Sequence, residues 1–166
     1  MKLLRKALKF AAEKHKGQTR KVSELPYIIH PVEVSFLVSK YKSSKRLEEL
    51  MCAAILHDVL EDTDTNFIEL ASEFTPLVAS LVLELSSDTD EIKRIGKNEY
   101  LKKKMLGMSN YGLFLKLCDR LSNISDNPTE KYLENTIDLI EFIVSNRSLT
   151  KSQKRVITAI KEVLYN

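Results

Sequence analysis

Two histidines and two aspartates in this 166-residue chain have the residue types and the surroundings of metal ligands. His57 and Asp58 are neighbours at the end of a strongly apolar run, where burial of an unpaired ionisable group is costly. Adjacent helical positions lie about 100° apart around the helix axis, so this imidazole and this carboxylate can converge on one ion. His30 precedes a proline, and Asp119 interrupts a third apolar segment. These four residues are therefore the candidate ligands.

The donor set indicates what such an ion would do. Two imidazoles and two carboxylates form a mixed nitrogen and oxygen site, which suits Mn²⁺, Fe²⁺ or Zn²⁺. Four protein ligands on a six-coordinate metal leave room for water and a phosphate oxygen, and such an ion acidifies the water and polarises the phosphorus. The residue before a proline is disfavoured in the right-handed helical region, so we expect His30 to have a non-helical backbone and a fixed ring direction.

Two more acidic residues follow the histidine and aspartate pair. Glu61 lies four residues after His57, and Asp62 lies four residues after Asp58. If the helix continues through this turn, both acids face the same groove as the pair. The alternative is a solvated acidic loop. His15 is expected to end the first helix, where the helix dipole favours a cation, so we predict a structural role for it.

The elements that must position these residues are helices. The chain has only four glycines and four prolines, and few breakers favour helices over a turn-rich β fold. We therefore predict the all-α class, with a single helical bundle domain over residues 1–166. The segments at 16–29 and 61–65 are predicted loops, and the charged stretch at 86–98 is predicted to be mobile. Apolar spacing predicts helices at about 2–15, 31–41, 47–59, 66–74, 76–85, 100–108, 112–124, 130–146 and 152–165.

Composition excludes several other classes of protein. The formal net charge of +3, from 26 basic and 23 acidic residues, is too balanced for a nucleic-acid binder. No apolar run approaches the roughly 20 residues of a membrane span, and the N-terminus is typical of an amphipathic helix, not a signal peptide. Cys52 and Cys118 lie in apolar runs without a CxxC spacing, which indicates buried free thiols. We therefore expect a cytoplasmic protein.

Four ordered blocks give the chain a family resemblance. They are a block with Ala12, His15, Gly17, Gln18, Arg20 and Lys21, then PYIIHP at 26–31, AAILHDVLEDT at 53–63 and KLCDRLSNI at 116–124. With these blocks the chain resembles the HD hydrolase domain of the RelA/SpoT family, especially its stand-alone small alarmone hydrolases of the metazoan SpoT-homologue type. The similarity extends to about residue 145, and the order of the four motifs is more specific than any one of them.

The resemblance implies an activity, a cofactor and roles for individual residues. The implied reaction is hydrolysis of guanosine 3′,5′-bis(diphosphate), ppGpp or pppGpp, at the 3′ position with release of pyrophosphate. The implied cofactor is one Mn²⁺ per chain, and the implied partner is a small nucleotide substrate, with no nucleic acid or membrane. The implied metal ligands are His30, His57, Asp58 and Asp119. The implied catalytic residues are Glu61 and Asp62, and the implied substrate-binding residues are Arg20, Lys21, Asn123 and Tyr132.

The sequence also departs from the family pattern. Family members often have a glycine just before the Pro-Tyr pair, where this chain has Ser23-Glu24-Leu25. Residues 86–112 match the family only loosely. Cys118 stands before Asp119, where the family usually has a small residue. These departures concern the identity of the nucleotide. Three alternatives therefore stay open: a phosphatase acting on NADPH or another phosphorylated nucleotide, a catalytically silent module that binds the alarmone, and a plain helical scaffold. The sequence does not indicate the oligomeric state.

Overall fold

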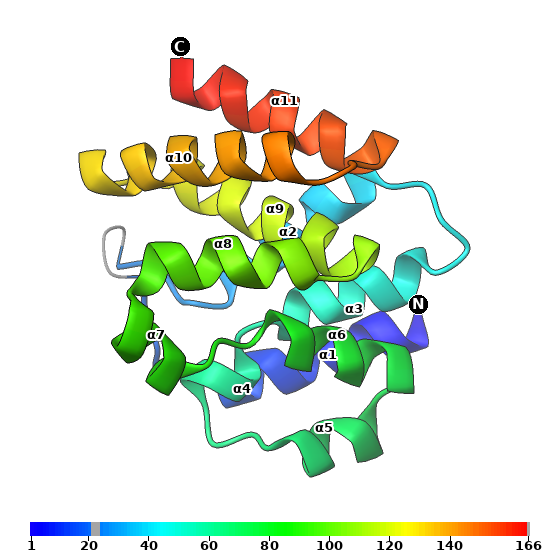
Figure 1. Ribbon diagram of the computed structural model, residues 1–166. Helices are drawn as coiled ribbons and strands as arrows, with labels where there is room; N and C mark the ends of the chain where they lie inside the picture. The colour runs from blue at the N-terminus through cyan, green and yellow to red at the C-terminus, as the bar shows by residue number, and fades with distance from the viewer. Residues whose placement is uncertain (21–23, 166) are drawn as a thin grey trace. The chain divides into compact units, whose positions relative to one another are not determined.

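The protein is built of α-helices, as the sequence predicts (Figure 1). The computed structural model describes residues 1–20 and 24–165. Within these residues there is no β-strand, and one isolated bridge pairs Thr19 with Pro26. The chain divides into two compact units, residues 1–86 and 87–166. The single domain expected over residues 1–166 stays a prediction.

In the first unit, α3 is the central helix, because α1, α2 and α6 all pack against it, while α5 packs on α6 (Figure 1). Five consecutive residues of α3, Cys52–Leu56, are buried, so the C-terminal half of this helix is apolar on all sides. The helices of the unit are α1 (Lys2–Lys14), α2 (Ile29–Tyr41), α3 (Leu47–Leu56), α4 (Val59–Asp62), α5 (Phe67–Glu73) and α6 (Pro76–Leu85).

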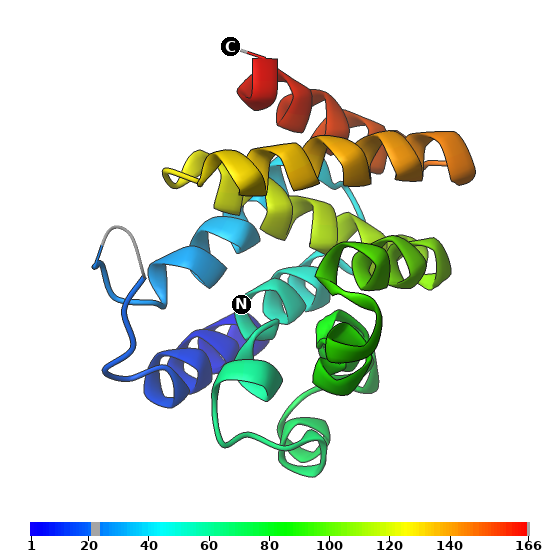
Figure 2. The same ribbon diagram turned by 60° about the vertical axis from the view of Figure 1, so that its left-hand side comes forward.

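In the second unit, α9 packs against α10 and α11, and α8 packs against α7 and α10. Both views show α10 and α11 side by side (Figures 1 and 2). The helices of this unit are α7 (Thr89–Ile95), α8 (Lys97–Gly107), α9 (Asn110–Ser125), α10 (Glu130–Asn146) and α11 (Lys151–Tyr165).

Two predicted helix starts in the first unit are confirmed by their capping bonds. The Asn66 side chain accepts a hydrogen bond from the Glu69 backbone N–H at 3.0 Å, so Asn66 caps α5. Pro76 occupies the first turn of α6, where its missing N–H would have no partner, and Thr75 caps that helix. The chain thus begins these helices by the local chemistry that the sequence indicates.

Four expectations about local structure are wrong. The predicted loop at 61–65 begins inside α4, which contains Glu61 and Asp62. His30 lies inside the first turn of α2, which begins at Ile29, so the following Pro31 does not exclude a helical backbone there. The N–H groups of a first turn have no helical partner, which makes proline tolerable at that position. The third helix ends at Leu56, earlier than expected. The stretch at 86–98 contains α7, because Asp88 caps a helix there by accepting from the backbone N–H groups of Asp90 and Glu91.

Candidate metal centre

His57 and Asp58 form the turn between α3 and α4. His57 is the residue that follows the last turn of the buried helix α3, and it is only 3% exposed. Asp58 precedes α4, and its backbone carbonyl accepts hydrogen bonds from the N–H groups of Glu61 and Asp62. The pair therefore joins the end of α3 to the start of α4.

The His57 ring has a defined tautomer. Its Nδ1 lies 2.7 Å from the carbonyl oxygen of Ala54, which can only accept a hydrogen bond, so Nδ1 carries the proton. The lone pair is then on Nε2, the form in which a neutral imidazole ligates a metal. Such a bond from the second ring nitrogen is the usual way in which proteins orient a metal-binding histidine. His57 therefore fits a metal-binding role.

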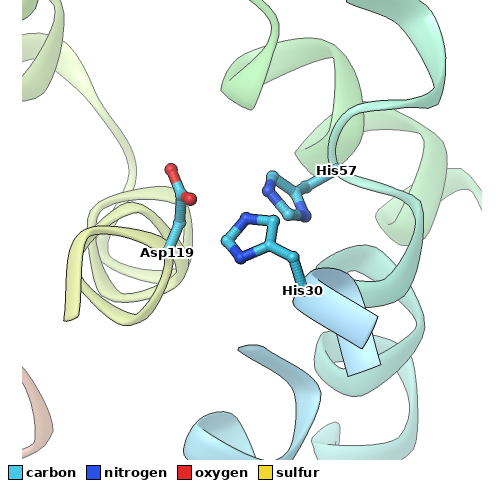
Figure 3. A group of neighbouring side chains, drawn as sticks. All are labelled: His30, His57 and Asp119. Atoms are coloured by element: carbon cyan, nitrogen blue, oxygen red, sulfur yellow. The ribbon is translucent and has the colours of Figure 1, made fainter. Parts of the chain in front are cut away.

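His30 brings a second imidazole to the same place. It is 3% exposed, and its ring centroid lies 5.2 Å from that of His57. One ligand nitrogen of each ring lies within 4.8 Å of the other, close enough for both to bind one ion (Figure 3). A buried pair of imidazoles with facing nitrogens has the donor type that Mn²⁺, Fe²⁺ and Zn²⁺ accept.

The Asp58 carboxylate completes this group within the first unit. Its Oδ2 lies 2.9 Å from His57 Nε2 and 4.0 Å from His30 Nε2. The Tyr27 hydroxyl donates a hydrogen bond to the same oxygen. Three of the four expected ligands are thus brought together by α2 and by the turn after α3.

The fourth expected ligand, Asp119, lies on α9 in the second unit and is labelled in Figure 3. It is 8% exposed and offers a carboxylate oxygen, a ligand type that suits the same metals. Lys116 Nζ lies 3.0 Å from its Oδ2, and Asn123 Nδ2 donates to its Oδ1 at 2.6 Å. Two neighbours on its own helix therefore hold this buried carboxylate.

The two expected catalytic acids lie on α4. Both Glu61 and Asp62 are exposed to solvent. Asp62 lies one helical turn after Asp58, and its Oδ2 lies 3.3 Å from the Tyr27 hydroxyl. The structure therefore brings Asp62 next to the Asp58 carboxylate through a shared tyrosine. Glu61 lies beside Asp62 in the same helical turn.

The expected substrate-binding residues fall in both units. Arg20 is half-buried in the loop after α1, and its backbone N–H donates to the carbonyl of Leu25 at 2.8 Å. Lys21 lies outside the described residues. Tyr132 lies in the first turn of α10, where its ring is 4.8 Å from the Arg120 guanidinium. The amide of Asn123 is engaged with Asp119, a contact that the sequence did not predict.

Sequence reasoning missed three residues that the structure places beside the expected ones. Tyr27 contacts both Asp58 and Asp62, Lys116 pairs with Asp119, and the buried Arg120 donates to the Thr136 hydroxyl at 3.1 Å. The spacing of Lys116 and Asp119, three residues apart on a helix, is a signal that could have identified that pair. Tyr27 carries no such local signal, because its partners are 31 and 35 residues away.

Comparisons with known proteins identify the family of the chain. The HD domain model matches residues 7–136. The guanosine-3′,5′-bis(diphosphate) 3′-pyrophosphohydrolase of Aquifex aeolicus is 37% identical over 130 residues, which cover 73% of this chain and 17% of that protein. The Danio rerio protein of the same name, MESH1, is 37% identical over 128 residues, which cover 75% of this chain and 68% of that protein. The chain thus spans less than a fifth of the Aquifex relative.

A solved structure supports the same relationship. It is that of a metazoan ortholog of SpoT that hydrolyses ppGpp, and it matches with a TM-score of 0.82 and 25% sequence identity. The match covers 98% of this chain and 94% of the other. The extent of the family match and the identity to MESH1 confirm the resemblance seen in the four sequence blocks. The chain belongs to the HD domain family and, within it, to the group of the SpoT-type and MESH1-type hydrolases.

Proposed function

We propose that this protein hydrolyses ppGpp and pppGpp at the 3′ position, using one Mn²⁺ per chain, and releases pyrophosphate. One observation carries the proposal. His30, His57 and Asp58 converge in a chain that is 37% identical to a fish protein named for this activity. HD hydrolases depend on a metal ion, and the imidazoles of His30 and His57 and the carboxylate of Asp58 are donors of the appropriate type. A plain helical scaffold has no need for two buried imidazoles facing a carboxylate.

The proposed ligands of the metal are His30, His57 and Asp58, together with Asp119 from the second unit. Their nitrogen and oxygen donors favour a cation such as Mn²⁺ over a soft metal. When bound, a divalent cation acidifies water and polarises the phosphoryl group. The hydrogen bond to the Ala54 carbonyl fixes the tautomer of His57. The rings of both His30 and His57 are buried.

The proposed chemistry assigns the proton transfers to the acids on α4. A water molecule attacks the phosphorus attached to the ribose 3′ oxygen, and Glu61, helped by Asp62, accepts the proton of that water. The new P–O bond forms as the bond between phosphorus and the 3′ oxygen breaks. The 3′ oxygen then takes up a proton, so that ppGpp and water give GDP and pyrophosphate. The solvent exposure of both acids gives them a route for proton exchange.

The proposed nucleotide site uses Arg20, Lys21, Asn123 and Tyr132. An arginine can stack on a purine or pair with phosphate, and a lysine can neutralise phosphate as a point charge. The Asn123 amide nitrogen already donates to Asp119, so its contribution to the substrate falls to the carbonyl oxygen, which can accept from a hydroxyl or N–H group. The Arg120 guanidinium covers one face of the Tyr132 ring, so a purine base would stack on the opposite face.

Incubation of the purified protein with ppGpp and Mn²⁺ tests the proposed function, with products separated by anion-exchange chromatography. We expect GDP and pyrophosphate in equal amounts, and no turnover by Glu61→Gln, which retains the shape of the side chain. NADPH and other phosphorylated nucleotides form the comparison panel. Faster phosphate release from one of these would favour the phosphatase alternative. Tight binding of ppGpp without products, under several divalent metals, would favour the silent binding module.

We also infer a cytoplasmic location from the two cysteines. Cys52 and Cys118 are free and buried, and free thiols persist in reducing compartments. In the part of the chain that the structure describes, no helix has the length and apolar character needed to cross a membrane.

A further inference from the structure

Tyr27 stands between the two functional carboxylates of the first unit. Its hydroxyl donates to Asp58 Oδ2 and lies 3.3 Å from Asp62 Oδ2. Asp58 is a proposed metal ligand, and Asp62 is a proposed catalytic acid. The proposed function gives Tyr27 no role, although it belongs to the block at 26–31 that contains His30.

The tyrosine ring is held by two imidazoles. Its centroid lies 4.8 Å from that of His15 and 6.1 Å from that of His30. His15 is 3% exposed, and the Tyr27 backbone N–H donates to the carbonyl of Gln18 at 2.9 Å. Contacts with two rings and an anchored backbone restrict the tyrosine, so the direction of its hydroxyl toward Asp58 and Asp62 is set by the fold.

Gln18 links His15 to the main chain of α4. Its Nε2 donates to the backbone carbonyl of Asp62 at 2.7 Å, and its Oε1 lies 2.8 Å from His15 Nδ1. Gln18 therefore binds the main chain of α4, whereas Tyr27 binds the carboxylates of Asp58 and Asp62. The Gln18 and Tyr27 hydrogen bonds involve different atoms, so a substitution can remove one and leave the other in place.

We propose that Tyr27 is a positioning residue that holds the Asp58 carboxylate in the orientation for binding metal and sets the distance between Asp58 and Asp62. This proposal rests on the proposed function. A phenol has one O–H group, so it donates fully to one carboxylate at a time, and the stronger bond goes to Asp58. Hydrogen bonds to a ligating carboxylate restrict its rotation, and loss of such a partner typically costs about 10- to 100-fold in metal affinity or activity.

Tyr27→Phe tests the proposal, because it removes the hydroxyl and keeps the ring that packs against His15 and His30. We expect the affinity for Mn²⁺, measured by isothermal titration calorimetry of the metal-free protein, to fall by about 10-fold. We expect kcat for ppGpp to fall and KM to stay unchanged, with an unaltered circular dichroism spectrum. Tyr165→Phe, at an exposed tyrosine near the end of α11, is the matched control and leaves all three quantities unchanged.

Gln18→Leu supplies a second variant that separates positioning from general loosening of the structure. It removes the bonds to the Asp62 main chain and to His15 Nδ1, and it leaves the Tyr27 hydroxyl in place. We expect a lower kcat with the affinity for Mn²⁺ unchanged. Equal losses of metal affinity in Gln18→Leu and Tyr27→Phe, or wild-type affinity in Tyr27→Phe, would overturn the proposal. A wild-type protein that binds Mn²⁺ but does not cleave ppGpp would refute the proposed function alone, because the affinity comparison still tests Tyr27.

Discussion

The amide of Asn123 donates a hydrogen bond to the carboxylate of Asp119, with 2.6 Å between Nδ2 and Oδ1. The two residues are one helical turn apart on α9. Lys116, on the preceding turn, lies 3.0 Å from the other carboxylate oxygen. Both oxygens of a buried acid are therefore engaged by its own helix, and the direction of the carboxylate is set before any metal binds.

This relationship predicts that Asn123→Ala weakens metal binding as well as catalysis. Without the amide, the Asp119 carboxylate rotates more freely and loses a charge-assisted hydrogen bond. We expect the dissociation constant for Mn²⁺ to rise by about 10-fold, as is typical when a partner of a metal ligand is lost. Titration calorimetry of the metal-free protein measures the change.

Asn146→Ala is the matched control for this experiment. Asn146 makes the same kind of bond to a residue four positions earlier, the carbonyl of Phe142, but contacts no carboxylate in the structure as described. Its substitution should leave Mn²⁺ affinity unchanged. An Asn123→Ala protein with normal metal affinity and a raised KM would show instead that Asn123 serves only the nucleotide.

The buried arginine next to Asp119 predicts an effect on stability. Arg120 is 6% exposed, donates to the Thr136 hydroxyl and lies over the Tyr132 ring, so it joins α9 to α10. Arg120→Met keeps the apolar stem and removes these interactions. We expect the free energy of unfolding to fall by about 1–3 kcal/mol, the usual cost of losing a buried hydrogen bond to a charged group.

Urea unfolding followed by circular dichroism measures this difference. Arg5→Met, at an exposed position of α1, should change the free energy of unfolding by no more than about 0.5 kcal/mol. Equal stability of the Arg120→Met protein and the wild type would contradict a structural role for the arginine.

The sequence predicts most of the fold because helices leave local signals. Asn66, Pro76 and the apolar spacing of α3 each act within a few residues, and the structure confirms the helices that they indicate. The helix at 89–95 was missed because it has no buried residue, so no apolar stripe reveals it. The N-cap residue Asp88 does indicate a helix start, but aspartate is also common in turns and loops.

The site is less predictable than the fold because its contacts are remote in the sequence. His57 and Asp58 can be recognised as candidate ligands from the sequence, because they are polar residues at the end of an apolar run. The convergence of Asp58 with His30 and Tyr27 depends on how α2 packs against α3, which spacing alone does not fix. The prediction that His30 avoids a helical backbone failed because the first turn of a helix tolerates the proline that follows it.

The cap of α7 gives a third prediction. Asp88→Ala removes the acceptor for two N–H groups of the first turn, and we expect faster hydrogen exchange of the amides in Thr89–Ile95. The loss of such a cap typically costs about 1 kcal/mol. Asp88→Asn keeps an acceptor oxygen and should exchange at nearly the wild-type rate. Unchanged exchange in Asp88→Ala would show that the contacts between α7 and α8 hold the helix without its cap.

The two cysteines give a fourth prediction. Burial raises the pKa of the Cys52 thiol to about 12 and raises that of Cys118 as well. Neither thiol forms a nucleophilic thiolate at pH 8, so we expect no reaction of the folded protein with a disulfide reagent such as DTNB. Two thiols should react after unfolding in guanidinium chloride. Rapid labelling of the folded protein would contradict the burial of these side chains.

The same pKa shifts predict how stability depends on pH. An unfolded cysteine ionises near its ordinary pKa of 9.0, whereas the buried thiols stay protonated to higher pH. The folded state therefore binds more protons above pH 9, and its stability falls as the pH rises by about 1.4 kcal/mol per unit for each thiol. Urea unfolding between pH 8 and 11 measures the slope, which Cys118→Ala should reduce.

We propose that His30, His57, Asp58 and Asp119 hold one divalent cation. Elemental analysis of the purified protein, loaded with Mn²⁺ and freed of excess metal, tests it most directly. We expect one manganese per chain in the wild type, and loss of most of that metal in both Asp58→Ala and Asp119→Ala. A folded Asp119→Ala protein that keeps one tightly bound manganese per chain would contradict it.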